Sequence, residues 1–295
     1  MRQAQKTISR DISIEGVGVH TGKHSVVKIH PATPDSGIII LNKFLPDEPI
    51  HVGKIIPEQT MHATVLKSKS WGVSTIEHLI AAIVGLEIDN VLIEISGIEA
   101  QRIEIPIIDG SALPFVQAIK KVGIKEQEKQ KKFITPKKPI FFEENNRFLQ
   151  IEPQAKPATP DPKNLFLKID YSVEFEHPLV KNKSFSETIS PDFFSTQIAP
   201  ARTFGFLEQL PILRKHGLAN GATLGNTVVV GEDSFLNTLR FEDEFIRHKI
   251  LDLIGDLGLL GKNLVGTIKA HKTGHNFNRL VIEHFINRPE EWQIL

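Results

Sequence analysis

One predicted helix carries polar side chains whose types and spacing could do chemistry. The helix covers 242–257, and the three side chains recur every four residues: His248, Asp252 and Asp256. At 100° per residue they share one side, opposite an apolar stripe. Phe245 and Leu259 point to the same side, which predicts a helix covered on both faces. Buried charge is costly unless paired, and a histidine and a carboxylate at i and i+4 can hold one metal ion. The helix is therefore the first candidate for a functional site.

A second candidate is the predicted helix over 74–84, which begins Ser-Thr-Ile-Glu-His-Leu. As local structure this is a capping box, in which the serine caps the helix and Glu77 reaches back to it. As chemistry, His78 would join His248 and Asp252 as a third metal ligand. Glu77 would then be the base beside the water that zinc hydrolases activate. The residues alone leave both interpretations open.

The composition excludes several classes of protein. The chain has 295 residues, of which 40% are hydrophobic, and its 35 basic residues balance its 35 acidic residues. Zero formal charge argues against nucleic-acid binding. The absence of cysteine excludes disulfides and thiolate metal sites and is compatible with a reducing compartment. The first ten residues lack the apolar run of a signal peptide, and no apolar run is long enough to span a membrane, so a cytoplasmic protein is expected. The oligomeric state stays open, and a monomer is compatible with the sequence.

Strand and helix signals alternate along the chain and predict an α+β fold in two domains, 1–128 and 129–295. Strands are expected at 25–30, 37–41, 90–96, from 139, at 165–173, and near 228, 268 and 280. Helices are expected at 74–84, 113–122, 190–195 and 242–257. The charged run 125–132 is predicted to be a solvated linker, and the proline-rich segment 153–162 a surface loop. We find no sequence repeat between the two halves.

Six motifs, in this order along the chain, resemble the signatures of the zinc-dependent UDP-3-O-acyl-N-acetylglucosamine deacetylases of lipid A biosynthesis. They lie at 16–22, 74–79, 104–111, 202–206, 240–257 and 274–278. The resemblance covers nearly the whole chain. It implies two domains of similar β-α-α-β layered topology, with the active site between them. It also implies Zn²⁺ on His78, His248 and Asp252, with Glu77 as the catalytic base.

The resemblance implies further roles, position by position. His275 matches a histidine that acts in its protonated form, and Asp256 the carboxylate that keeps it charged. Thr203 matches a hydroxyl that stabilises the oxyanion. Lys249 matches a lysine near the substrate's phosphates, where a point cation suits a diphosphate. Two further residues fall where the family lines its substrate passage: His20 and Phe204.

Two segments depart from the family pattern. Residues 220–225 (Asn-Gly-Ala-Thr-Leu-Gly) replace a Gly-Gly-Ser type loop followed by an acidic residue, and 153–162 is longer than the family leads us to expect. The remaining histidines are expected to be surface or structural residues: His24, His30, His51, His62, His177, His216, His271 and His284.

The expected activity is removal of the N-acetyl group from the UDP-linked, acylated glucosamine, releasing acetate. Two alternatives stay open. One is a zinc hydrolase acting on another acylated amide, and the other is a metal-stabilised binding module without turnover. Glu77 argues against the second, because a structural metal site needs no base and usually closes its fourth position.

Overall fold

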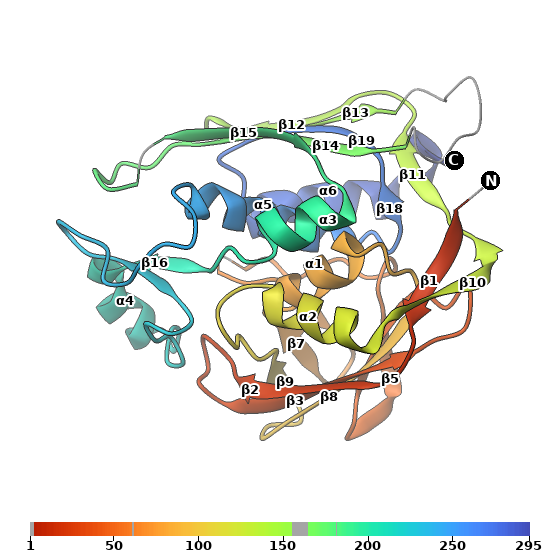
Figure 1. Ribbon diagram of the computed structural model, residues 1–295, viewed down its shortest axis with the longest axis horizontal. Helices are drawn as coiled ribbons and strands as arrows, with labels where there is room; N and C mark the ends of the chain where they lie inside the picture. Colours follow the sequence, from red (N-terminus) through yellow and green to blue (C-terminus); the bar gives the residue numbers. More distant parts are fainter. Residues whose placement is uncertain (1–2, 61, 155–164, 181) are drawn as a thin grey trace.

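The computed structural model describes residues 3–60, 62–154, 165–180 and 182–295. Two five-stranded sheets form the outer layers, and helices fill the space between them (Figure 1). The α+β class predicted from the sequence is confirmed. Within the described residues, none of the helices combines the length and the apolar composition that a membrane span requires.

One strand order occurs twice. The first sheet has the order β2-β3-β8-β4-β5, and the second has the order β12-β13-β19-β14-β15. In each sheet the third and fourth strands are parallel and every other neighbouring pair is antiparallel. Apart from shorter elements, each half runs through four strands, a helix, a strand and a helix. The predicted domain boundary at 128/129 stays a prediction.

The bounds of the main elements are as follows. The first half contains β2 (Ile12–Val17), β3 (His24–Pro31), β4 (Ile38–Asn42), β5 (Leu45–His51), α1 (Glu77–Gly85), β8 (Val91–Gly97) and α2 (Leu113–Val122). The second half contains β12 (Ile140–Glu144), β13 (Arg147–Pro153), β14 (Leu167–Val173), β15 (Lys183–Thr188), α5 (Glu244–Gly258), β19 (Gly266–His271) and α6 (His275–Asn287).

Shorter elements complete the structure. They are β1 (Ala4–Ile8) with β10 (Ile124–Gln130), the sheet of β6 (Val65–Lys67), β7 (Gly72–Ser74) and β9 (Arg102–Glu104), the pair β16 (Phe204–Phe206) and β17 (Val228–Val230), and the sheet of β18 (Asn263–Leu264), β11 (Phe133–Pro136) and β20 (Trp292–Ile294). Short helices are α3 (Pro191–Phe193), which continues as a π-helix over Phe194–Ile198, and α4 (Leu210–Lys215).

Alternating side chains attach each sheet to the helices. In β8 the residues Val91, Ile93 and Ile95 are fully buried, while those between them are partly exposed. Strand β19 shows the same alternation, with Ile268 and Ala270 buried. Fully burying a valine or isoleucine side chain stabilises the fold by roughly 1.5–3 kcal/mol relative to exposure. These one-sided strands therefore fix which face of each sheet the helices cover.

Helices α1 and α5 cross at very short distance. The predicted burial of α5 on both faces is confirmed, because 13 of its 15 residues are buried. A Cβ atom added at Gly255 would lie 2.2 Å from the carbonyl oxygen of Glu77, and one at Gly258 would lie 2.7 Å from Ile80. Only glycine at these positions allows the two backbones to approach so closely.

Three local predictions are wrong. The helix predicted from residue 74 begins at Glu77, because Ser74 ends strand β7. The run 125–132, predicted to be a linker, is largely strand β10, whose side chains are exposed but whose backbone pairs with β1. The strand predicted near Leu280 is part of α6, where apolar side chains bury one helical face. Most of the predicted loop 153–162 lies outside the described residues, and Pro153 ends β13.

We predict that Gly255→Ala separates α1 from α5. The new Cβ would meet backbone rather than a flexible side chain, and such overpacking typically costs about 1–3 kcal/mol. The free energy of unfolding should fall by this amount in a denaturant titration. Gly225→Ala is the matched control, because a Cβ there is at ordinary contact distance from Thr223. Equal stability of the two variants would contradict the close crossing.

Candidate active site

One cavity between the two halves collects nearly all the residues predicted to do chemistry. Its volume is about 250 Å³. Nine of the ten predicted site residues line it: His20, Glu77, His78, Thr203, Phe204, His248, Lys249, Asp252 and His275. The tenth, Asp256, hydrogen-bonds to His275. The structure therefore brings together side chains from both ends of the sequence.

The crossing of α1 and α5 creates a group that could hold a metal ion. The ligand atoms of His78, His248 and Asp252 all lie within 4.8 Å of one another, and all three residues are buried. Oδ1 of Asp252 is 3.7 Å from Nε2 of His78 and 3.4 Å from Nε2 of His248. Two nitrogens and a carboxylate oxygen form a donor set that suits a transition metal such as zinc.

The protonation of this group also fits a metal. Burial lowers the pKa of His248 to about 4, so its imidazole is neutral. Nδ1 of His248 donates to the carbonyl oxygen of Ala201 at 3.1 Å, which leaves the Nε2 lone pair directed at the group. Burial opposes the charge of Asp252, but His248 and a hydrogen bond from His78 hold its pKa well below the usual value. A neutral histidine and an ionised aspartate, as at His248 and Asp252, are the forms that bind metal.

Glu77 is a buried carboxylate at the start of α1. Burial raises its pKa to about 7, although the nearby His275 and His78 oppose this. Its Oε2 accepts a hydrogen bond from the backbone N–H of Thr64 at 3.0 Å. The capping-box interpretation is wrong, because α1 has no side-chain cap and the carboxylate points to the cavity instead. A carboxylate with a pKa near 7 is suited to accept and return a proton at neutral pH.

His275, the first residue of α6, is held by a carboxylate behind it. Nδ1 of His275 is 2.9 Å from Oδ2 of Asp256, and Nε2 is 3.9 Å from Oε1 of Glu77. Burial opposes a charge on His275, but Asp256 outweighs it and raises the pKa to about 10. The imidazolium is therefore the stable form at neutral pH, and its Nε2–H faces the cavity.

Thr64 and Asn278 complete this hydrogen-bond system, and sequence reasoning missed both. The Thr64 hydroxyl donates to Oδ1 of Asp256 and lies 3.2 Å from Nδ1 of His275. Asn278 donates to Oδ2 of Asp256 at 2.8 Å. Asn278 ends the motif at 274–278, which was a signal for it, whereas no local pattern marks Thr64. His62, expected to be a surface or structural residue, also lines the cavity.

The opposite wall is anchored by a buried ion pair. Arg202 donates through Nε to Glu244 at 2.8 Å, and its backbone N–H donates to the same carboxylate at 3.0 Å. This contact fixes the segment that carries Thr203 and Phe204 against α5. Lys249 reaches the cavity from α5, with Nζ 3.8 Å from Oδ2 of Asp252. The catalytic and binding roles predicted for these residues stay predictions.

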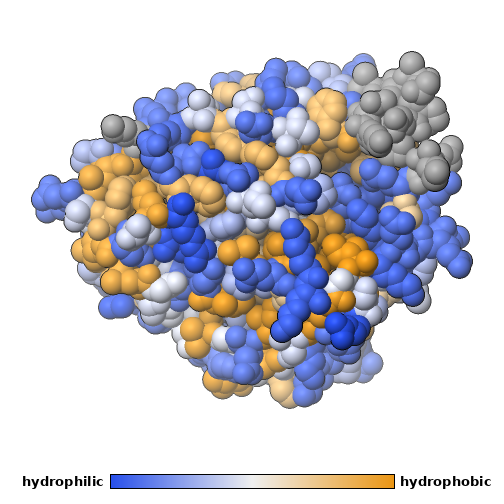
Figure 2. Space-filling model, viewed as in Figure 1, coloured by the Kyte–Doolittle hydropathy of each residue, from blue (hydrophilic) through white to orange (hydrophobic). Residues whose placement is uncertain are grey.

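The end of the cavity near α4 is apolar. Its lining there includes Phe206, Leu213, Ala219 and Ala222. Figure 2 shows hydrophobic side chains gathered on the surface at the side where α4 and β16 lie in Figure 1. The exposed large apolar side chains between residues 204 and 236 are Leu207, Ile212, Leu224 and Leu236. The cavity thus combines a polar, charged end with an apolar end.

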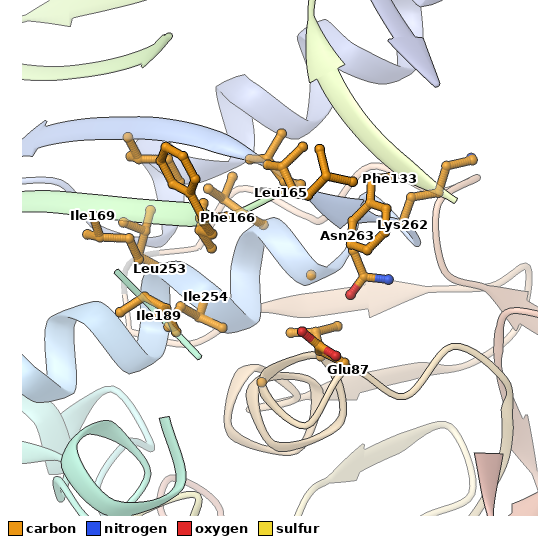
Figure 3. A pocket seen from close by; sticks show the side chains of 18 of the residues that line it. Glu87, Phe133, Leu165, Phe166, Ile169, Ile189, Leu253, Ile254, Lys262 and Asn263 are labelled. Carbon is orange, nitrogen blue, oxygen red and sulfur yellow. The ribbon is translucent and has the colours of Figure 1, made fainter. Parts of the chain in front are cut away.

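A second cavity, of about 100 Å³, lies along another face of α5 (Figure 3). Leu253 and Ile254 line it from α5, and most of its other side chains are apolar. Its charged members have partners elsewhere, since Glu87 pairs with Lys6 at 2.9 Å and Lys262 lies over the ring of Trp292. None of the predicted site residues lines this cavity, so we assign it no part in the chemistry.

The first cavity has the geometry of a metal-dependent hydrolase site. Such sites combine three nitrogen or oxygen ligands with a neighbouring base and keep one coordination position for water or substrate. Here the three candidate ligands lie beside Glu77, and the charged His275 faces them from α6.

Similarity to known proteins identifies the family. The family model for UDP-3-O-acyl N-acetylglycosamine deacetylase matches residues 5–287. A deacetylase of this name from Syntrophus aciditrophicus is 38% identical over 291 residues, which cover 98% of this chain and 88% of the relative. Those from Teredinibacter turnerae and Chromobacterium violaceum are 39% and 35% identical, covering 99% and 98% of this chain and 93% and 92% of the relatives. The chain therefore belongs to the UDP-3-O-acyl N-acetylglycosamine deacetylase family.

We predict that Asp256→Asn lowers the pKa of His275 from about 10 towards its ordinary value of 6.5, because the raising effect comes mainly from the Asp256 charge. The pKa of His275 is higher in the folded protein than in the unfolded chain. The pair's contribution to stability is therefore complete below about pH 6.5, and it is lost as pH rises through about 10. NMR titration of the ring signals measures the shift. Asp11→Asn, which removes the partner of His30, is the control. An unchanged His275 titration in Asp256→Asn would contradict the assignment.

Proposed function

We propose that this protein is a zinc-dependent amidohydrolase that removes the N-acetyl group from UDP-3-O-acyl-N-acetylglucosamine. The products would be UDP-3-O-acyl-glucosamine and acetate, in a step of lipid A biosynthesis. The observation that carries the proposal is the position of Glu77 and His275 beside the group of His78, His248 and Asp252 in one cavity. The names of the relatives support the choice of substrate.

His78, His248 and Asp252 would hold the zinc ion. Two imidazoles and one carboxylate are a ligand set found in catalytic zinc sites, and all three residues are buried. A zinc ion bound there supplies Lewis-acid chemistry, polarising a carbonyl and lowering the pKa of water.

The pKa shifts of Glu77 and His275 support the following proton transfers. Glu77, with a pKa of about 7, takes a proton from the attacking water. His275 carries its proton on Nε2 towards the cavity, where it stabilises the developing oxyanion and then protonates the leaving amine. Thr203 contributes its hydroxyl to the oxyanion from the opposite wall. Asp256 keeps His275 charged until this proton is transferred to the amine.

The two ends of the cavity suit the two ends of the substrate. Lys249 is cationic, since Tyr171 and Asp252 raise its pKa against the effect of burial, and an ammonium group suits a diphosphate. The apolar end near α4 suits the acyl chain. His20 and Phe204 line the passage between the walls and would contact the substrate directly.

We expect the purified protein to contain tightly bound zinc and to deacetylate UDP-3-O-acyl-N-acetylglucosamine until a chelator removes the metal. His78→Ala and His248→Ala should each lose most of the zinc and of the turnover, because a site with two protein ligands binds weakly. Metal analysis and an acetate-release assay measure the two effects. His30→Ala is the control, because His30 lies on β3 and lines no part of the cavity. Full zinc content in the His78→Ala, His248→Ala double variant would overturn this ligand set.

Glu77→Gln should keep the fold and the zinc but lose on the order of 10²-fold or more in kcat, the range for removing a general base. The amide keeps the size of the side chain and can still accept the hydrogen bond from the N–H of Thr64. Thermal unfolding, metal analysis and kcat separate the effects. Normal turnover together with an early melting transition would assign Glu77 a structural role instead.

A further inference from the structure

The loop over 18–22 connects the two halves at the edge of the cavity. It carries His20, which lines the cavity, and its backbone accepts hydrogen bonds from the other half. The N–H of Asn220 donates to the carbonyl of His20, and that of Gly221 to Val19, each at 3.0 Å. A Cβ atom at Gly221 would lie 2.1 Å from the carbonyl oxygen of Gly18, so the segments touch. The variant segment 220–225 is thus part of this contact.

The buried carboxylate of Glu104 holds this loop through hydrogen bonds. Glu104 ends strand β9 and is 4% exposed. Its Oε1 accepts from the backbone N–H of His20 at 2.8 Å, and its Oε2 accepts from the N–H of Thr21 at 2.7 Å and from the Thr21 hydroxyl at 2.6 Å. A Cβ atom at Gly18 would lie 2.1 Å from the same carboxylate. The loop is therefore wrapped around the Glu104 side chain.

The same carboxylate holds the residue that leads into helix α1. Thr75 has a φ angle of +57°, which is a genuine outlier for a β-branched residue. Its hydroxyl donates to Oε1 of Glu104 at 3.0 Å. Thr75 precedes Glu77 by two residues, so its conformation sets where Glu77 and His78 enter the cavity. Such strain persists only where the surroundings hold it.

We propose that Glu104 is a positioning residue of this active site. It fixes the substrate-side loop through His20 and Thr21, and the base-bearing end of α1 through Thr75. The proposal rests on the proposed function for its kinetic consequences, while the contacts themselves do not depend on it. Glu104 can hold both segments because its carboxylate has two oxygens that accept hydrogen bonds. A neutral amide side chain of the same size has only one such oxygen.

Glu104→Gln tests the proposal with little change in shape. The amide nitrogen must face either the His20 N–H and the Thr75 hydroxyl, or the Thr21 N–H and the Thr21 hydroxyl. One backbone donor therefore loses its acceptor, and the hydroxyl beside it must turn from donor to acceptor. We expect kcat to fall and KM to rise, with kcat/KM lower by roughly tenfold to a hundredfold, the range for a donor left without its acceptor. Bound zinc should be unchanged. Glu99→Gln is the matched control, because Glu99 is exposed and ties Lys23 beside the same loop. It should behave as wild type.

A second substitution separates positioning from general destabilisation. Glycine adopts a positive φ without strain, so Thr75→Gly no longer needs the hydrogen bond from Thr75 to Glu104. In the Glu104→Gln background it should restore most of kcat and leave KM raised, because the loop stays unpaired. A lowered melting temperature with wild-type kcat and KM in Glu104→Gln would overturn the proposal. Failure of Thr75→Gly to restore kcat would overturn the part that acts through α1.

Two further sets of variants test the contacts of Glu104 if Glu104→Gln does not fold or if the protein has no activity. If Glu104→Gln does not fold, Thr75→Val and Thr21→Val each remove one hydroxyl and should lower kcat and raise KM, respectively. If the wild-type protein binds zinc poorly or does not turn over, the proposed function fails. In that case NMR tests the contact between Glu104 and the loop directly. The His20 ring signals, identified by their loss in His20→Gln, should shift in Glu104→Gln and not in Glu99→Gln. Unshifted signals would overturn the contact itself.

Discussion

The close contact between α1 and α5 at Gly255 is the constraint on which the site depends. Because a Cβ atom there would lie 2.2 Å from the carbonyl of Glu77, the two backbones pack without an intervening side chain. Asp252, about one turn before Gly255, therefore comes within 3.7 Å of His78. Neither half of the chain holds a complete ligand set. The contact that stabilises the two halves against each other is thus the contact that assembles the site.

Burial at this contact also acts on ionisable groups of the site. It raises the pKa of Glu77 to about 7 and lowers that of His248 to about 4. His275 differs because Asp256 lies directly behind it and raises its pKa to about 10. A proton acceptor and a proton donor consequently face each other in one buried space, which is how paired acid and base roles arise at neutral pH.

The sequence predicts those features that have a local period. Helix α5 and its polar side follow from the four-residue spacing of His248 and Asp252, and the alternating strands follow in the same way. The strand order cannot be predicted in this way, because it depends on which strands pair with each other. The two halves also share no sequence repeat that would reveal their common topology. Contacts between distant residues are equally hidden, since Thr64 and Asp256 are 192 residues apart. Helix α6 was mistaken for a strand because its apolar residues over 280–282 are consecutive.

The repeated topology explains how one fold supplies both the proposed acid and the proposed base. The equivalent helices α1 and α5 meet at the centre, and each contributes side chains to the group that could hold a metal ion, yet the proposed base, Glu77, lies on α1 alone. The final helices of the two halves differ more, because α2 begins at Leu113 with no polar cavity group, whereas α6 begins at His275. The proposed base and the proposed acid thus come from opposite halves. The distance between these two residues depends on how the two halves pack against each other. The loop over 18–22 makes a second contact between the halves, away from the helix crossing, and this contact helps to fix their relative position.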